Sequence, residues 1–348
     1  MNRLHNLDYL RGLAAFGIMM YHYLMFTFGI FPSETFIGRV GVYGVSIFYV
    51  LSGLTLYYVY YNKMLPSKPE ILSFFKKRFF RIFPLLWLVT VISIILSKKL
   101  PDMTQLILNL TGLFGLIQWD KYFSAGVWSI GNELVFYIFF PFFIFFTKQS
   151  KIMMIILSLF IFSFYLYFAF ILLDRNIDLQ LQWRNYVNPL NQVFLFLGGF
   201  LIGLVFQNIT IKNSVSLLVL ILGLCIFIFY PVYGNTIHLV TGFTRIIFTV
   251  SCFLICLSFY KLSFKLPTIA HQPLALLGEA SYSVYLLHPL VYSIINIFSK
   301  YFFHFPKSII LILSVISTLV ISYFVYEYFE KYFMKMGSKK KNNLGLLT

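Results

Sequence analysis

The chain has 348 residues, of which 60% are hydrophobic, 21% are aromatic and only 11% are charged. A soluble domain carries roughly a quarter charged residues, so this composition excludes a soluble globular fold and indicates an integral membrane protein. The net charge of +16 is then typical of basic loops that set membrane topology, and no nucleic-acid partner is expected.

Apolar runs long enough to cross a bilayer as helices recur along nearly the whole chain, without the alternation that β-barrel strands show. They predict an all-α integral membrane bundle of about ten transmembrane helices, at 7–30, 40–61, 80–97, 128–147, 152–173, 190–207, 214–233, 239–260, 277–299 and 308–328. A less apolar stretch, 104–119, is an eleventh candidate. A crossing there would turn the basic C-terminal tail outward. The positive-inside rule therefore favours ten spans, cytoplasmic N- and C-termini, and an interfacial or re-entrant 104–119.

The chain is expected to hold one membrane domain, 1–335, and a basic, polar cytoplasmic tail, 336–348. A metal site is not expected, because the three cysteines, Cys225, Cys252 and Cys256, all lie within apolar runs.

The first predicted span contains LDYLRGLAAFGIMMYHY (7–23), with Arg11 near its start and His22 deep within it. Ionisable groups are costly in hydrocarbon and usually mark a functional site. Eleven residues are close to three helical turns, so both side chains lie on one face, with His22 roughly 16 Å deeper. This alignment favours a functional pair over a structural histidine.

The second predicted span contains GVYGVSIFYVLSG (41–53). Its glycines, with Ser46 and Ser52, are typical of close helix approach. They equally leave room for a slender substrate, and both interpretations stay open.

The third predicted span opens with KKRFFRIFP (76–84) on the cytoplasmic side. Basic residues in that place are ordinary topology signals or lipid headgroup contacts. Arg78 and Arg81, however, are i, i+3 neighbours followed by Pro84, and paired guanidiniums suit multidentate phosphate recognition.

The fourth predicted span holds Glu133, in VWSIGNELVFY (127–137), the only acid deep in a predicted span. A carboxylate there needs a partner or a proton. The predicted topology puts His22 and Arg245 at a similar depth. A pair with His22 would serve general-base catalysis, whereas a pair with Arg245 would be a structural bridge.

The segment SYSVYLLHP (281–289) places Ser281, Tyr285 and His288 at i, i+4, i+7, which predicts one helix face directed into the bundle. These residues can bind a polar substrate or join helices by hydrogen bonds. The two interpretations are weighed evenly.

Six segments together resemble the acyltransferase 3 family of membrane O-acyltransferases, in the family's own order. They resemble its R-x10-H, G-V-x-x-F-F-V-L-S-G, R-x-x-R-I-x-P, W-S-L-x-x-E-x-x-F-Y, L-G-x-x-S-Y-x-I-Y-L-x-H-x-P and E-K-P-F patterns. Tyr49 replaces the second phenylalanine of the second pattern, Pro289 follows His288 directly, and Tyr332 replaces the proline of the last. The segments are LRGLAAFGIMMYH (10–22), GVSIFYVLSG (44–53), RFFRIFP (78–84), WSIGNELVFY (128–137), LGEASYSVYLLHPL (277–290) and YFEKYF (328–333).

The resemblance implies a ten-helix enzyme of the bacterial cytoplasmic membrane that takes acyl groups from cytoplasmic acyl-CoA. Acetyl-CoA is the expected donor, no cofactor is tightly bound, and the acceptor is a hydroxyl of a surface polysaccharide or its lipid-linked precursor. Many relatives carry a fused extracytoplasmic hydrolase domain of SGNH type, and the length of this chain predicts a stand-alone acyltransferase. The expected partners are acyl-CoA, the glycan and membrane lipids.

By the same resemblance, His22 is the catalytic base or an acyl relay, and Arg11 helps to set the site. Arg78 and Arg81 contact the coenzyme phosphates. Apart from the resemblance, Glu133 is expected to support His22, because the predicted topology puts the two at a similar depth. The remaining candidates are expected to bind substrate: Trp128, Ser129, Ser281, Tyr285, His288 and Arg245.

Two other classes remain as alternatives. An exporter of a glycan or small anion would use His22, Glu133 and Arg245 as a proton relay, although no internal repeat of the kind that transporters often show is found. A scaffold of a polysaccharide synthase would not need the aligned Arg11 and His22. Binding of acetyl-CoA separates the enzyme from both.

Overall fold

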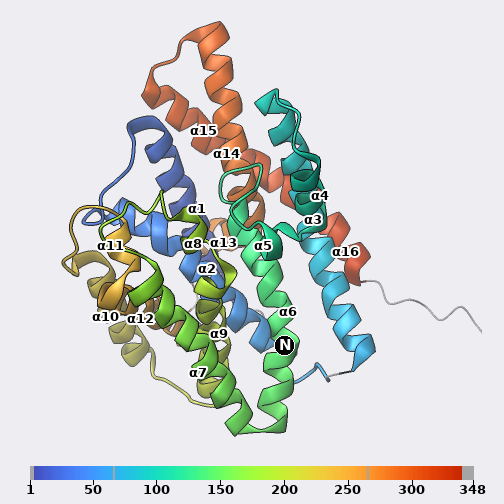
Figure 1. The fold of residues 1–348 in the computed structure, drawn as a ribbon, viewed down its shortest axis with the longest axis vertical. Coiled ribbons are helices and arrows are strands. Elements are labelled where there is room, and N and C mark those ends of the chain that lie inside the picture. Colours follow the sequence, from blue (N-terminus) through green and yellow to red (C-terminus); the bar gives the residue numbers. More distant parts are fainter. Residues whose placement is uncertain (1–3, 66, 265, 339–348) are drawn as a thin grey trace, which may run out of the picture.

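A computed structural model describes residues 4–65, 67–264 and 266–338, and these residues form helices joined by turns and loops, with no strand among them (Figure 1). The helices are, in chain order, α1 (His5–Phe28), α2 (Phe36–Tyr60), α3 (Lys68–Ser97), α4 (Met103–Thr111), α5 (Phe114–Ile117), α6 (Val127–Gln149), α7 (Lys151–Tyr167), η1 (Phe168–Leu172), α8 (Trp183–Tyr186), α9 (Pro189–Phe206), α10 (Asn213–Phe229), α11 (Ile237–Val240), α12 (Gly242–Lys261), α13 (Thr268–Glu279), α14 (Ser281–Phe298), η2 (Ser299–Phe303), α15 (Lys307–Phe324), η3 (Val325–Glu330) and α16 (Lys331–Ser338).

Seven helices in this part of the chain are long and apolar enough to cross a bilayer, or eight if α13 and α14, bent by 71°, form one broken span. The predicted class, an all-helical multi-pass membrane protein, is therefore confirmed. All ten predicted spans coincide with helices. Three are not among the seven: α1, which carries Asp8, Arg11 and His22; α10, which has 17 residues; and the predicted span 277–299, which lies on the bent pair α13 and α14. The count of ten and the cytoplasmic termini stay predictions.

The stretch predicted to be interfacial or re-entrant, 104–119, forms α4 and α5, of nine and four residues. Neither reaches the ~20 residues that a crossing helix needs. Helix α5 packs against α6, and Phe114 is fully buried. The membrane position of this stretch stays a prediction.

Helix α2 lies in the middle of the bundle, with α10 and α12 on one side and α3 and α6 on the other (Figure 1). Of its most apolar stretch 72% is buried, against 17% for Lys307–Ser338 at the periphery. A Cβ on Gly53 would lie 1.9 Å from the carbonyl oxygen of Phe196 in α9, and one on Gly199 equally close to that of Val50. The predicted close helix approach in 41–53 is thus confirmed at Gly53.

The predicted tail, 336–348, begins inside α16, which packs against α3. Its residues 339–348 lie outside the described residues.

Arg39, near the start of α2, joins this helix to the end of α10. The side chain is buried, and its Nε donates to the carbonyl oxygen of Ser33 at 3.0 Å. Its Nη1 donates to the carbonyls of Phe227 (2.9 Å) and Ile228 (2.7 Å), and its Nη2 to that of Tyr230 (2.8 Å). The last carbonyls of a helix have no partner within the helix and carry partial negative charge, so one guanidinium stabilises this end by both effects.

Replacing Arg39 by methionine should lower the free energy of unfolding by about 3 kcal/mol or more, because several hydrogen bonds from a charged donor are lost. Denaturant unfolding of the purified protein in detergent measures this. The matched control is Arg184→Met: Arg184 is 67% exposed and lies 3.9 Å from Asp120, and such pairs contribute about 1 kcal/mol or less. Equal losses in both variants would contradict the role of Arg39.

Candidate active site

A cavity of about 250 Å³, which we call the arginine cavity, lies among α1, α2, α3, α6 and α14. Its apolar wall includes Val45, Phe48 and Val59 of α2. Its polar wall consists of Arg11, Tyr49, Ser52, Thr55, Arg78, Arg81, Ser129, Glu133, Tyr137, Ser281, Tyr282 and Tyr285.

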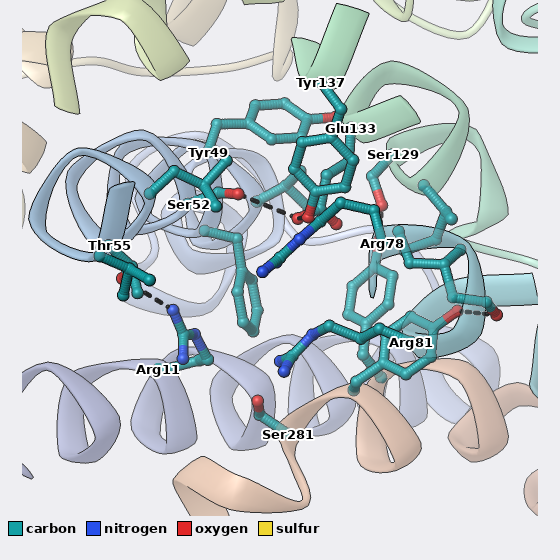
Figure 2. A pocket seen from close by; sticks show the side chains of 18 residues that line it. Arg11, Tyr49, Ser52, Thr55, Arg78, Arg81, Ser129, Glu133, Tyr137 and Ser281 are labelled. Atoms are coloured by element: carbon teal, nitrogen blue, oxygen red, sulfur yellow. Dashed lines mark hydrogen bonds between the residues drawn. The ribbon is translucent and has the colours of Figure 1, made fainter. Parts of the chain in front are cut away.

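Three guanidinium groups converge in the arginine cavity. Figure 2 shows Arg11 reaching in from α1, and Arg78 and Arg81 reaching in from α3. Arg11 donates to Thr55 Oγ1 at 3.0 Å and pairs with Asp8 at 3.7 Å. Arg81 has no hydrogen bond or ion pair with any residue that the structure describes. Three cations facing one carboxylate make a site that attracts anions.

Aromatic rings position Arg78. Its guanidinium carbon lies 5.6–5.8 Å from the ring centres of Tyr60, Phe74 and Tyr137, within range of cation–π attraction. A longer hydrogen bond of 3.4 Å joins its Nη2 to the Tyr60 hydroxyl. These contacts fix the direction of the guanidinium and leave it facing the cavity.

The carboxylate of Glu133 accepts hydrogen bonds from Ser52 Oγ at 2.9 Å and from the Tyr137 hydroxyl. It lines the arginine cavity, whereas His22 lines a different cavity. The predicted Glu133–His22 pair is therefore wrong. The reason lies in α6: Trp128, in its first turn, lines the cavity of His22, and Glu133 follows more than one helical turn later, in the arginine cavity.

Arg245 is not beside Glu133 either, so the predicted bridge between them is also wrong. Its Nη2 donates to the carbonyl of Asn191 at 2.8 Å, and its guanidinium lies 4.3 Å from the ring centre of Tyr165. Arg245 is buried but lines neither of the two cavities.

The second cavity, of about 660 Å³, contains His22, and we call it the histidine cavity. Trp128 lies in its wall, with the ring centre of Trp183 5.6 Å away in an edge-to-face arrangement. The indole of Trp183 donates to the Tyr122 hydroxyl at 2.8 Å. The wall further includes Tyr21, Phe26, Val42, Val45, Tyr122, Gly126, Asp178, Gln180, Trp183, Tyr186, Gly234, Asn235, Thr236 and Tyr285.

The hydrogen-bond partner of His22 is His288, with 2.8 Å between Nδ1 of His22 and Nε2 of His288. The Nδ1 of His288 lies 3.1 Å from the carbonyl oxygen of Val284, which can only accept a hydrogen bond. With both rings neutral, this contact puts the proton of His288 on Nδ1, so its Nε2 accepts from His22. His22 then carries its proton on Nδ1 and an unprotonated Nε2, the state of a general base.

The face predicted for Ser281, Tyr285 and His288 is confirmed, since all three are buried on one side of α14. Ser281 lines the arginine cavity and Tyr285 lines both cavities. The Tyr285 hydroxyl is 2.7 Å from Ser129 Oγ and donates to the Gly126 carbonyl at 2.9 Å. This face thus joins helices by hydrogen bonds and also reaches both cavities.

Sequence reasoning missed several partners of the charged groups. Tyr137 lies at i+4 from Glu133, a spacing that could have indicated the contact. Ser52 belongs to the segment 41–53, for which the sequence predicts close helix approach or room for a substrate, but not a bond to Glu133. Thr55 and Tyr60 belong to no motif, and nothing in the sequence pairs them with arginines of other helices.

Residues 4–327 match the acyltransferase 3 family, described as an acyltransferase domain. The chain belongs to this family. The family that the six sequence segments resemble is thereby confirmed. Curated relatives include the O-acetyltransferase OatA of Staphylococcus aureus strains NCTC 8325 / PS 47, COL and MRSA252, each 24% identical over 372 residues. The match covers 97% of this chain and 58% of each relative, so the chain spans somewhat more than half of their length. No solved structure matches the chain.

The proton positions in the histidine pair can be measured directly. We expect the ¹⁵N spectrum of labelled protein to show Nδ1 protonated and Nε2 unprotonated in both His22 and His288. In His288→Leu, which removes the acceptor, this preference of His22 should be lost. Protonation of His22 at Nε2 in the unsubstituted protein would contradict the assignment.

Proposed function

We propose that this chain is a membrane-bound O-acyltransferase of the bacterial cytoplasmic membrane. It moves an acyl group, an acetyl group in the first place, from cytoplasmic acyl-CoA to a hydroxyl of a surface polysaccharide or its lipid-linked precursor. The observation that carries the proposal is the pair of adjoining cavities, one with three guanidiniums and one with an oriented imidazole. The name of the S. aureus relative, O-acetyltransferase, supports the acetyl group and the oxygen acceptor.

The arginine cavity suits the donor. Coenzyme A ends in phosphate groups, which guanidiniums bind by charge-assisted, bidentate hydrogen bonds. Drug-sized ligands occupy cavities of about 300–1,000 Å³, so a cavity of about 250 Å³ fits the narrow pantetheine arm better than the whole coenzyme. Arg78 and Arg81, in the first half of α3, then hold the phosphates. Arg11 and Glu133 line the path of the pantetheine arm.

The histidine cavity suits the acceptor. In the general-base route, His22 Nε2 takes the proton of the acceptor hydroxyl as its oxygen attacks the thioester carbonyl. The new C–O bond forms, the C–S bond breaks, and the proton passes from the imidazolium to the coenzyme sulfur. In the relay route, Nε2 itself attacks the thioester carbonyl, and the C–S bond breaks as the acyl–nitrogen bond forms. The acceptor hydroxyl then attacks the acyl group, the C–N bond breaks, and the hydroxyl proton ends on the sulfur. His288 positions His22 in both routes.

Arg78→Ala and Arg81→Ala should each weaken acetyl-CoA binding about 10- to 100-fold, because hydrogen bonds to a charged group contribute about 1.5–3 kcal/mol. Titration calorimetry on purified protein measures this. S-acetylpantetheine, which lacks phosphates, is the matched ligand, and its affinity should not change. Equal losses for both ligands would mean a damaged fold rather than lost phosphate contacts.

His22→Ala should reduce acyl transfer at least ~100-fold, the usual contribution of a general base, and leave acetyl-CoA binding intact. His288→Gln, which can still accept from His22, should retain more activity than His288→Leu. Proton NMR of O-acetyl groups on the host's surface glycan, with each variant and without the gene, gives the readout. Full acylation by His22→Ala would refute the catalytic role, and glycan export without acylation would favour a transporter.

A further inference from the structure

Two residues, Val45 of α2 and Tyr285 of α14, line both the arginine cavity and the histidine cavity. Both are 5% exposed, so each fills the space between the cavities and not an outer surface. The ring of Tyr285 packs edge-to-face on Phe48, in the wall of the arginine cavity, and lies 6.0 Å from the ring of His288, which holds His22. The two cavities are therefore separated by little more than these side chains.

Tyr285 is held across this boundary by the first turn of α6. Its hydroxyl contacts Ser129, which lines the arginine cavity, and Gly126, which lines the histidine cavity. Ser129 Oγ also lies 2.9 Å from the Gly126 carbonyl. Three short contacts thus share only two hydroxyl protons, since the carbonyl brings none. One of the three contacts always lacks a proton, and the Gly126 carbonyl can accept from Ser129 as well as from Tyr285.

Gly126 allows this close approach. Its φ is +84°, a left-handed conformation that other residues adopt at a cost. A Cβ there would lie 3.1 Å from the Tyr285 hydroxyl oxygen and 3.3 Å from the ring carbon that bears it. A larger residue at this position would push Tyr285 out of the boundary.

We propose that Val45 and Tyr285 form a partition that the acyl group must reach, and that this partition selects short acyl groups. The inference rests on the proposed function and adds its acyl specificity. With the pantetheine arm in the arginine cavity and the reactive nitrogen of His22 in the histidine cavity, the thioester carbonyl lies at the boundary. The acyl chain then packs against Val45 and Tyr285. The bonds made and broken remain those of the transfer described above.

The size of the expected effect follows from general specificity data. One extra methylene in an apolar pocket changes kcat/KM by about 10- to 200-fold. Val45 and Tyr285 belong to the buried core, so the protein cannot shift them cheaply to admit a longer chain. Shortening Val45 removes two methyl groups at the boundary and should therefore admit longer acyl groups.

The test compares acetyl-, propionyl-, butyryl- and hexanoyl-CoA as donors for the purified chain in lipid vesicles with the glycan acceptor. The measured quantity is the ratio of kcat/KM for butyryl-CoA to that for acetyl-CoA. Val45→Ala should raise this ratio at least about 10-fold. Tyr285→Phe keeps the ring but frees it from Ser129 and Gly126, and should raise the ratio as well.

Helix α2 offers matched controls of the same residue type. Val42 lines only the histidine cavity and Val59 only the arginine cavity. Val42→Ala and Val59→Ala should leave the ratio unchanged, whatever they do to the absolute rates.

Each outcome is decisive. The partition is overturned if Val45→Ala leaves the ratio unchanged, or if both valine controls raise it equally. In either case, acetyl transfer by the unsubstituted chain still supports the proposed function. Absence of transfer from every thioester by the unsubstituted chain overturns the proposed function and, with it, the partition. A rise confined to Val45→Ala and Tyr285→Phe supports both.

Discussion

Three guanidinium groups gathered in one cavity of an apolar bundle are the constraint on which the rest of the site depends. Charge that leaves water loses several kcal/mol of solvation free energy unless polar groups replace it. Here the replacements come from other helices: Thr55 of α2 for Arg11, the ring and hydroxyl of Tyr60 for Arg78, and the Glu133 carboxylate for the cluster as a whole. The cluster therefore requires α2 and α6 to pack close to α1 and α3. The glycines of the buried helix α2 and the buried first turn of α6 allow this close packing.

Three helices, α1, α14 and α6, each contribute residues first to one part of the site and then, further along the helix, to the next. On α1 the order runs from Arg11, which lines the arginine cavity, to His22, which lines the histidine cavity. On α14 it runs from Ser281 through Tyr285 to His288, and on α6 it runs in the opposite chain direction from Trp128 through Ser129 to Glu133. A rigid helix fixes these separations, so the residues of the two cavities keep their spacing along each helix.

The sequence predicted relations within one helix well, because helical periodicity alone determines them. The common face of Ser281, Tyr285 and His288 is an example. Predicted relations between helices were wrong where they depended on depth. A similar depth suggested His22 or Arg245 as the partner of Glu133, but Trp128, in the first turn of α6, lines the cavity of His22, and Glu133 lies more than one turn further on. The contact between His22 and His288 joins residues 266 positions apart, and periodicity does not tell which helices are neighbours. Helix identity and the family were predictable; the choice of partners required the packed structure.

Arg39 has a consequence for how this architecture can vary. It holds the end of α10 and the following turn only through backbone carbonyls, and Ser33 likewise bonds the carbonyl of Gly234 at the rim of the histidine cavity. Every amino acid supplies the same carbonyl, so the hydrogen bonds of Arg39 and Ser33 do not depend on the side chains of the loop that they hold. Side chains of this rim can therefore change while its backbone keeps its place, except at Gly234, whose φ of +85° favours glycine. Variation of the cavity rim and maintenance of the fold are in this way separated within a few residues.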